Sequence, residues 1–549
     1  MPGRLLTLCL ALAAGMALAA GAEAQQHSPD AALDRVIQEA RAAGCAEPDS
    51  GGLVRILCSG KLRVGVHNSY PLFGRLKNGK HRGYEIDVAR AIAKRLGVEP
   101  EFTKVNAASR IPMLADNRID LAIATMGHNT QRDGQARFIR PHYYRSETIL
   151  VGRRDLRIAG WDELRGRTVC VSIGNGSNSE LVSHGAHLML FADSAMLPDR
   201  LRDGTCSLAA QDDSFFAYYF TDPDFAGRFD AKFGFTPVPW GIGAARNGSD
   251  KLARALDLMS QIFHRDGVFL EAAKANHVGT AFLERQQAVW ARADCNTDTG
   301  SGNPACILPP FDNALEPTAI AAPVTAFERW YNRLTGSDLQ LPMLKTVPAR
   351  SMFMSGVANS LMLIAGALAA TLGFALLFGA MAGSRYRLLH WPVRAITIAV
   401  QSSPIVLTLV IVSAVMHSVI TYSSNGALCA AILALGLANG ANAGQAIAEA
   451  LLTLRAERSG RPLDLFARAL SRAATQIAAF LINAAKGTPI ASFIGAPELL
   501  SALTDITSFS SGRTTTYTLL LVFYTAVVML VVWLCRRLQA HLERRQAAA

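Results

Sequence analysis

The sequence predicts a soluble α/β half with two lobes, followed by an all-α membrane half of about five transmembrane helices. Strand and helix patterns alternate over residues 60–292, as in parallel sheets covered by helices. From Ser351 onward, uncharged apolar stretches exceed the ~20 residues that cross a bilayer core. A chain of 549 residues is also too long for one hydrophobic core. We therefore expect separate soluble and membrane domains.

Residues 1–24 have the layout of a cleavable export signal. Arg4 precedes an apolar run over residues 5–20, and small residues surround the predicted cleavage site at Ala24. A polar lead segment, residues 25–59, follows. The two lobes are therefore expected outside the cytoplasm.

Most of the nine cysteines lie in this exported half, where an oxidising compartment preserves disulfides. Several pairings are possible. Proximity in sequence favours two of the pairs that we expect, and a shared lobe favours the middle one. The expected pairs are Cys45–Cys58, Cys170–Cys206 and Cys295–Cys306. Metal binding is the weaker alternative, because no Cys-x-x-Cys motif or histidine cluster accompanies these cysteines.

Two series of α/β elements are expected in the soluble half. The first contains a strand over residues 61–66, an amphipathic helix over 84–96 and a strand over 119–124. The second begins with a strand over 168–172 and includes 207–210. Each series would form one lobe, with a cleft between the two.

A spacer over residues 293–350 is expected to join the halves. Its first part is rich in Gly, Pro, Asn and Thr and contains one predicted disulfide.

The membrane domain is expected over residues 351–549. Ser351–Ser384 holds no charged residue, and the uncharged stretch 395–448 is long enough for two spans. A fourth span is expected around 473–485 and a fifth over 514–535. Polar and glycine-rich segments inside these spans would face protein or a pathway. Close helix packing through small residues is an equal alternative for the glycines.

The net charge of +11 arises largely from arginines beside the apolar spans. They form groups at 385–394, 455–472 and 536–545, which all fall on one side of the membrane if the first span starts outside. The positive charge is then explained by arginine-rich loops that stay on the cytoplasmic side of the membrane. Nucleic acid is therefore excluded as a partner. The expected location is the bacterial inner membrane, with the two lobes in the periplasm and the spans against lipid.

The soluble half resembles the periplasmic amino-acid-binding proteins of ABC importers. The matching stretches follow the order of that family over about residues 60–290. They are Leu62–Val66 with Tyr70–Phe73, Gly83–Val88, Arg110–Pro112 with Asp120–Leu121, Thr130–Arg132 with Phe138 and Pro141, and Gly204 with Asp212.

The resemblance assigns a role to each end of an amino acid. Arg132 stands where the family binds the ligand α-carboxylate, although an ordinary surface arginine is the alternative. Asp212 stands where the family binds the α-ammonium, and a loop or capping acid is the alternative. Ser177 and Asn178 lie in a loop that opens a helix, where N–H groups can meet a carboxylate.

Other positions bear on the ligand side chain. Tyr70 and Phe73 are expected either in the aromatic wall of the cleft or in the core. His67 takes a position that tends to be acidic in binders of cationic amino acids, which disfavours a cationic ligand. The stretch around Arg110 is similar to that of acidic-amino-acid binders, where the arginine receives a side-chain carboxylate.

Thr125 and Gly127 occupy positions that often carry hydroxyl groups for the ligand carboxylate. Gly127 removes one of these expected contacts.

The membrane half resembles the permease subunits of polar-amino-acid ABC importers. The matching residues are Ser360–Leu361, Ser403–Pro404, Ala448–Glu449, Lys486–Gly495 and Glu498–Leu500. The chain departs from the family in the loop that docks into the ATPase, which is shortened and lacks the Glu-Ala-Ala motif. The best substitute is one face of a predicted helix that carries Leu463, Phe466, Ala467 and Leu470.

These resemblances imply a fused substrate-binding and permease subunit of an ABC importer for an acidic or amide amino acid. No cofactor or metal is expected. No catalytic residue is assigned, and a separate cytoplasmic ATPase subunit would hydrolyse ATP. Two chains would pair through their membrane domains. One alternative is a receptor or channel that uses the same lobes without ATP, and another is an exported enzyme such as a dehydratase.

Overall fold

The computed structural model describes most of the chain after the expected export signal. The described residues are 28–45, 52–312, 315–384, 386–419, 423–457, 461–508 and 513–547. Residues 1–24, the expected signal, lie outside them. The chain divides into two units, the first built mainly from residues 28–150 and 211–312 and the second mainly from 151–210 and 315–507.

The predicted two-lobed α/β fold is confirmed by two five-stranded sheets, in the orders β5-β1-β6-β13-β7 and β10-β9-β11-β8-β12. In the first sheet β1 pairs in parallel with β5 and β6, and β13 is antiparallel. The bounds are β1 Lys61–Val66, β5 Glu99–Lys104, β6 Leu121–Ala122, β7 Ala136–Phe138, β8 Tyr144–Arg153, β9 Thr168–Ser172, β10 His187–Phe191, β11 Leu208–Asp212, β12 Phe229–Trp240 and β13 Gly243–Ala245. A small sheet contains β2 Ser69–Tyr70, β3 Gly74–Lys77 and β4 Lys80–Arg82.

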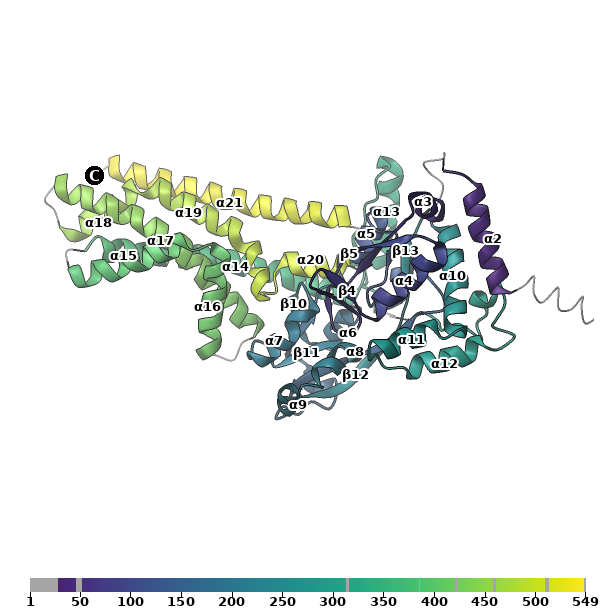
Figure 1. Cartoon of the computed structure of the whole chain (residues 1–549). Helices are drawn as coiled ribbons and strands as arrows, with labels where there is room; N and C mark the ends of the chain where they lie inside the picture. The colour runs from purple at the N-terminus through teal and green to yellow at the C-terminus, as the bar shows by residue number, and fades with distance from the viewer. Residues whose placement is uncertain are drawn as a thin grey trace, which may run out of the picture. The chain divides into compact units, whose positions relative to one another are not determined.

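Amphipathic helices cover the sheet of the first unit. Helix α4 buries Ile86, Ala89 and Ile92 and ends at Gly97, whose φ of 73° suits a residue without a side chain. Helix α10 contacts α2, which lies beside it in Figure 1. The helices of this unit are α2 Pro29–Ala42, α3 Gly52–Ser59, α4 Tyr84–Leu96, α5 Arg110–Ala115, α8 Asp213–Tyr219, α9 Pro223–Arg228, α10 Asp250–Arg265, α11 Val268–Ala275 and α12 Ala281–Trp290.

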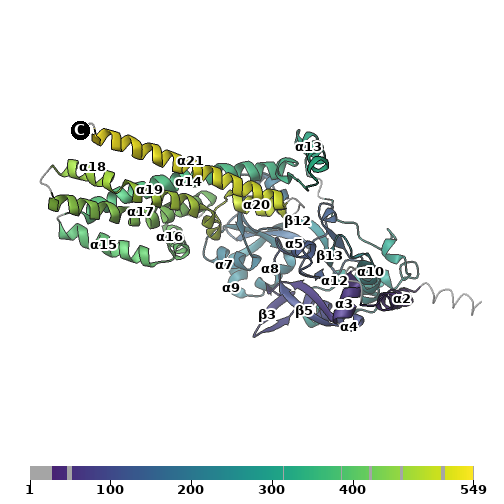
Figure 2. The ribbon, with the colours of Figure 1, turned by 90° about the horizontal axis from the view of Figure 1, so that it is seen from above.

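The second unit joins part of the second sheet, with β9 and β10 parallel, to the all-helical C-terminal region. Figures 1 and 2 show its long helices α14, α17, α19 and α21 side by side. Its helices are α6 Asn178–Ser183, α7 Leu197–Arg202, α13 Ala321–Thr335, α14 Val347–Ala382, α15 Arg387–Ser402, α16 Ile405–Val419, α17 Ser424–Glu457, α18 Pro462–Arg472, α19 Ala474–Gly487, α20 Leu499–Thr507 and α21 Arg513–Ala547, and the 3₁₀ segment η6 spans Thr488–Ile494.

The prediction of about five spans agrees with the part of the chain that the structure describes, which holds four helical segments long and apolar enough to cross a membrane and a shorter apolar helix. The four are Val347–Ala382, Ser424–Glu457, Ala474–Ile494 and Arg513–Ala540. The shorter one, Ile405–Met416, follows the break between α15 and α16 at Ser403 and Pro404. A proline at this point ends a helix because it lacks the N–H that helical bonding needs.

The glycines of α17 are explained by close helix packing. A Cβ atom at Gly436, Gly440 or Gly444 would collide with α14, at Ala370, Phe374 and Phe378 in turn. The spacing of four residues keeps all three glycines on one face of the helix. Of the two explanations that the sequence allowed, the packing of small residues therefore applies here.

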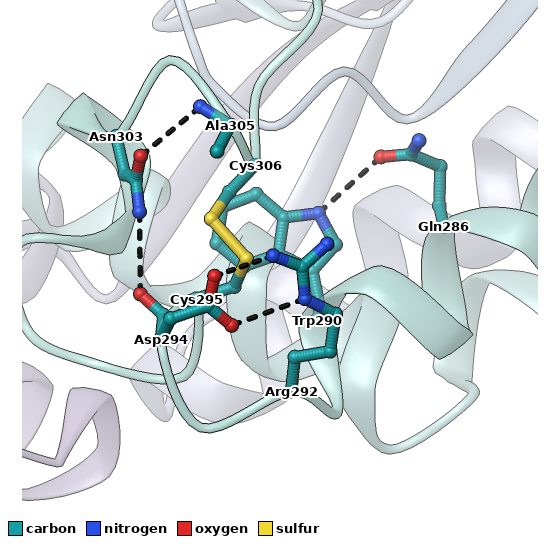
Figure 3. The surroundings of a disulfide bond; sticks show 8 residues. All are labelled: Gln286, Trp290, Arg292, Asp294, Cys295, Asn303, Ala305 and Cys306. Carbon is teal, nitrogen blue, oxygen red and sulfur yellow. Dashed lines mark hydrogen bonds and ion pairs between the residues drawn. A yellow bond between two sulfur atoms is a disulfide. The ribbon is translucent and has the colours of Figure 1, made fainter.

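All three predicted disulfides are confirmed: Cys45–Cys58, Cys170–Cys206 and Cys295–Cys306. Figure 3 shows the last bond against Trp290, whose indole N–H donates to Gln286 at 3.3 Å. Asp294 lies near both sulfur atoms but pairs with Arg292. Because the sulfurs are bonded to each other, they offer no thiolate ligands to a metal.

Removing the Cys170–Cys206 bond should destabilise the protein. A disulfide that closes a loop of 36 residues is expected to contribute about 4 kcal/mol. The double variant Cys170→Ala/Cys206→Ala should therefore melt at a lower temperature than the parent chain, as followed by calorimetry. Cys429→Ala, which replaces an exposed free cysteine, is the control. Equal melting temperatures for the double variant and the parent would contradict the expectation.

Candidate functional site

Several of the predicted site residues meet where β1 and β6 end in the first unit. His67 follows β1, while Thr125 and Gly127 follow β6. Because β1 and β6 are parallel, their carboxyl ends lie at one edge of the sheet, which is where open α/β sheets bind ligands. The His67 Nε2 atom lies 3.1 Å from the Thr125 hydroxyl oxygen.

Thr125 has an unusual backbone conformation, with a φ of 47°. Non-glycine residues rarely adopt this left-handed region, and surrounding contacts must hold them there. Its N–H donates to the Glu85 carboxylate at 2.6 Å, and its carbonyl accepts from Arg110 Nη1 at 3.1 Å. With the His67 contact, the N–H, the carbonyl and the hydroxyl of Thr125 are all engaged.

Glu85 is a site residue that the sequence analysis missed. Its buried carboxylate also accepts a hydrogen bond from Tyr143 Oη at 2.5 Å. Burial raises its pKa from 4.5 to about 7, against the lowering effect of the bonds from Tyr143 and Thr125. The signal in the sequence was a carboxylate on the apolar stripe of the helix, seven residues before Ile92.

Arg110 stands at the start of α5 and is buried. Its Nη1 donates to the carbonyls of Ala124 and Thr125. In this structure, therefore, the arginine positions the segment after β6.

Arg132 is 2% exposed, so the alternative of an ordinary surface arginine is wrong. Its Nη1 donates to the Gly127 carbonyl at 2.7 Å. A Cβ at Gly127 would lie 3.0 Å from both methyl groups of Val238. This crowding gives a physical reason for glycine where a hydroxyl residue was expected.

Tyr70 and Asp212 form a direct link, because the Tyr70 hydroxyl donates to Asp212 Oδ2 at 2.9 Å. The rings of Tyr70 and Phe73 are both buried and lie edge to face, 5.6 Å apart. Both also contact Trp240. The two aromatic residues therefore belong to the core, and the hydroxyl of Tyr70 extends from it to a predicted ligand-binding carboxylate.

Burial sets the proton affinity of Asp212. It raises the pKa from 3.8 to about 7, while the hydrogen bond from Tyr70 acts in the opposite direction. A buried carboxylate of this kind favours a cationic partner, because a positive charge compensates the lost hydration.

Ser177 and Asn178 are buried in the second unit, before and at the start of α6. This helix has only six residues, too few for a strong dipole, so side-chain and loop donors matter more. The Asn178 Nδ2 donates to the Ser172 carbonyl at 3.0 Å and to Asp505 Oδ1 at 2.7 Å.

The four residues suggested for ATPase docking lie on α18. Leu463 and Ala467 are exposed, whereas Phe466 and Leu470 are half-buried. The buried residues of this helix are Leu465 and Ala469, which pack against Leu451 and Leu454 of α17. Only part of the suggested face is therefore open to a partner.

Replacing Glu85 should reduce the dependence of stability on pH. A carboxyl whose pKa is raised on folding stabilises the protein most below pH 4.5, and this contribution falls as the pH rises to about 7. Glu85→Gln should flatten the fall in melting temperature between pH 5 and 8, an effect on the order of 3 kcal/mol. Part of the dependence of melting temperature on pH should remain in this variant, because burial also raises the pKa values of Asp212 and Asp257. Glu99→Gln, at an exposed position, is the control. An unchanged slope in Glu85→Gln would contradict the expectation.

Comparison with known proteins places the site in a family. Residues 62–277 match the bacterial extracellular solute-binding proteins, family 3. A glutamine-binding protein of Geobacillus stearothermophilus is 31% identical over 204 residues, which cover 35% of this chain and 76% of that protein. The ABC transporter glutamine-binding protein GlnH of Bacillus subtilis is 29% identical over 231 residues, 40% of this chain and 83% of that protein.

An enzyme is also among the relatives. The cyclohexadienyl dehydratase of Pseudomonas aeruginosa is 25% identical over 166 residues, 29% of this chain and 62% of that protein. The two relatives described before it are binding proteins. With the parallel sheets and the buried site described above, these matches establish that the chain, through residues 62–277, belongs to the bacterial extracellular solute-binding proteins of family 3.

Proposed function

We propose that the protein binds a polar amino acid outside the cytoplasm and conducts it across the membrane as the binding and permease part of an ABC importer. The observation that carries this proposal is the pair of opposite charges, Arg132 and Asp212, buried within one unit of a solute-binding protein. An amino acid presents a carboxylate and an ammonium group. The guanidinium suits the first and the carboxylate suits the second.

The ligand side chain is proposed to be acidic or an amide. Arg110 supplies a buried positive charge beside Thr125. His67 takes a position that, by the family resemblance, tends to be acidic in binders of cationic amino acids. Two of the relatives bind glutamine by name, which agrees with an amide. Because Arg110 also supports the Thr125 backbone, it would serve both the loop and the ligand.

The helical region of the second unit is proposed to form the permease, and two copies of the chain are proposed to pair through this region. Gln401, Gln445 and Glu449 are exposed on α15 and α17 and form a chain of hydrogen bonds of 2.6 and 2.8 Å. A cavity of about 260 Å³ beside them is also lined by His390 and Arg394. Polar groups at membrane depth require protein or water around them. A second copy of the chain would provide that cover.

ATP hydrolysis is proposed to come from a separate cytoplasmic subunit. The exposed residues Leu463 and Ala467 of α18 offer an apolar surface for that subunit.

Arg132→Ala should weaken amino-acid binding strongly. The full chain, purified in detergent, is titrated with each of the twenty amino acids in a calorimeter, and the parent chain should bind Glu, Asp or Gln. The variant should bind the same amino acid at least about a hundredfold more weakly, because the ligand loses a buried charged partner. Arg137→Ala, an exposed arginine five residues away, is the control. No binding by the parent chain, or equal binding by Arg132→Ala, would overturn the assignment.

Affinity should also fall as the pH is lowered through about 7. The ligand ammonium requires ionised Asp212, and below its pKa a proton competes for the same carboxylate. Each further unit of pH should weaken binding about tenfold. Asp212→Asn should bind the amino acid weakly at every pH. Glu85→Gln should keep the dependence of affinity on pH. Affinity that is constant from pH 5 to 8 would contradict the role of Asp212.

A further inference from the structure

Helix α13, which precedes the first candidate span, carries an apolar stripe on its surface. Phe327, Trp330 and Leu334 are 46%, 54% and 69% exposed, and Ile320, just before the helix, is 41% exposed. Intervals of seven, three and four residues place these side chains on one face of the helix. A contiguous exposed patch of large apolar side chains marks a contact surface.

The rest of the α13 surface is polar. Glu328 is buried, accepts a hydrogen bond from the Leu341 N–H at 2.5 Å and forms an ion pair with Lys345 at 2.6 Å. The other charged residues of the helix, Arg329 and Arg333, are exposed. The exposed charges of α13 are therefore all positive. An aromatic apolar stripe opposite a polar face with arginines is typical of helices that lie in the interface of a membrane.

Hydrogen bonds attach the chain around α13 to the start of α14. The Thr318 N–H donates to the Lys345 carbonyl at 3.0 Å, and the Thr318 hydroxyl donates to the Leu344 carbonyl at 2.6 Å. The Val347 N–H donates to the Glu316 carbonyl at 2.9 Å. The segment before α13 thus pairs with the segment that enters α14, and the helix is held at the end of a candidate span.

The loop after α13 shows the level of the helix along the spans. The Gln340 N–H donates to Thr515 Oγ1 at 3.4 Å, near the start of α21. Leu521, which is 67% exposed, lies about 9 Å further along α21, at 1.5 Å per helical residue. The arginines of α21 begin at Arg536, toward its other end. The loop is therefore bonded to α21 at the end where the apolar surface of this candidate span begins.

The direction of α13 agrees with a place at the membrane surface. Figure 1 shows this helix running across the direction of α14 and α21, beside the ends at which both begin. Helices that cross a bilayer run along its normal, so a helix that runs across them at this level lies along the surface.

We propose that α13 is an interfacial helix that binds the phospholipid surface on the periplasmic side of the membrane. Its apolar stripe packs against the acyl chains, and Arg333, three residues after Trp330, reaches the phosphate groups at the edge of the stripe. The helix holds the linker between the soluble and helical parts of the chain at the membrane surface. This inference goes beyond the proposed function, because it requires that α14 and α21 cross the membrane but not that the ligand be an amino acid.

The test is quenching of Trp330 fluorescence by lipid in the full chain. The chain is reconstituted into phosphatidylcholine vesicles with bromine atoms near the headgroup end of the acyl chains, and into vesicles without bromine. Bromine quenches a tryptophan only at short range, and the difference in fluorescence between the parent and Trp330→Phe reports Trp330. Brominated lipid should reduce this difference about twofold. Trp161→Phe, in the second lobe, is the matched control, and its difference should be equal in both vesicles.

A second variant tests the stripe itself. Phe327→Asp/Leu334→Asp should remove most of the quenching of Trp330, because carboxylates are costly among acyl chains. Ala322→Asp, which adds a charge at an exposed position outside the stripe, should keep it. Melting temperatures show whether each variant is folded, and Leu334→Asp alone replaces the double variant if that one does not fold.

Two results would overturn the lipid contact. One is a Trp330 signal that brominated lipid leaves unchanged, and the other is quenching at the parent level in the folded stripe variant. If the stripe variant also changed the oligomeric state, the stripe would instead be assigned to contact with a second copy of the chain. Failure of the parent chain to bind amino acids would overturn the proposed function and leave the lipid contact intact.

Discussion

The candidate site depends on the way one strained residue is held. Thr125 has a left-handed backbone, and its three polar groups are engaged by Glu85, Arg110 and His67. Strain of this kind persists only where the surroundings determine the conformation. The segment that follows leads through Gly127 to Arg132, whose guanidinium bonds back to it. A buried hydrogen-bond network thus sets the path of the segment that carries Arg132.

Burial gives these charges their chemical character. Glu85 and Asp212 both have a pKa of about 7, because little water reaches either carboxylate. The two residues nevertheless differ in their partners. Glu85 bonds to protein on Thr125 and Tyr143, whereas Asp212 is approached by the Tyr70 hydroxyl at the edge of an aromatic cluster. Glu85 is therefore suited to support, and Asp212 is suited to a cationic ligand group.

In the helical region, the constraint is close packing. Three glycines of α17 bring its backbone against α14. Gln445 and Glu449 of α17 and Gln401 of α15 are exposed. Small residues permit such contact in membranes, where apolar side chains gain little from leaving lipid. In the same unit, Asp505 of α20 accepts a hydrogen bond from Asn178, so a short helix of the C-terminal region is bonded to a loop of the second lobe.

The sequence by itself determined the α/β class and the helical membrane region, because periodicity and hydropathy are local properties of the chain. It favoured the three disulfide pairs among several possible pairings, and the structure shows these three. The candidate charged residues of the site came from a resemblance to a family. Only the tertiary structure decided what those residues contact. Tyr70 and Phe73 could have lined a cleft or filled the core, and the structure buries both rings against Trp240. Glu85 and Asp505 were not singled out, because their partners lie 40 and more than 300 positions away. Long-range contacts of this kind arise from folding and leave only weak traces in the sequence.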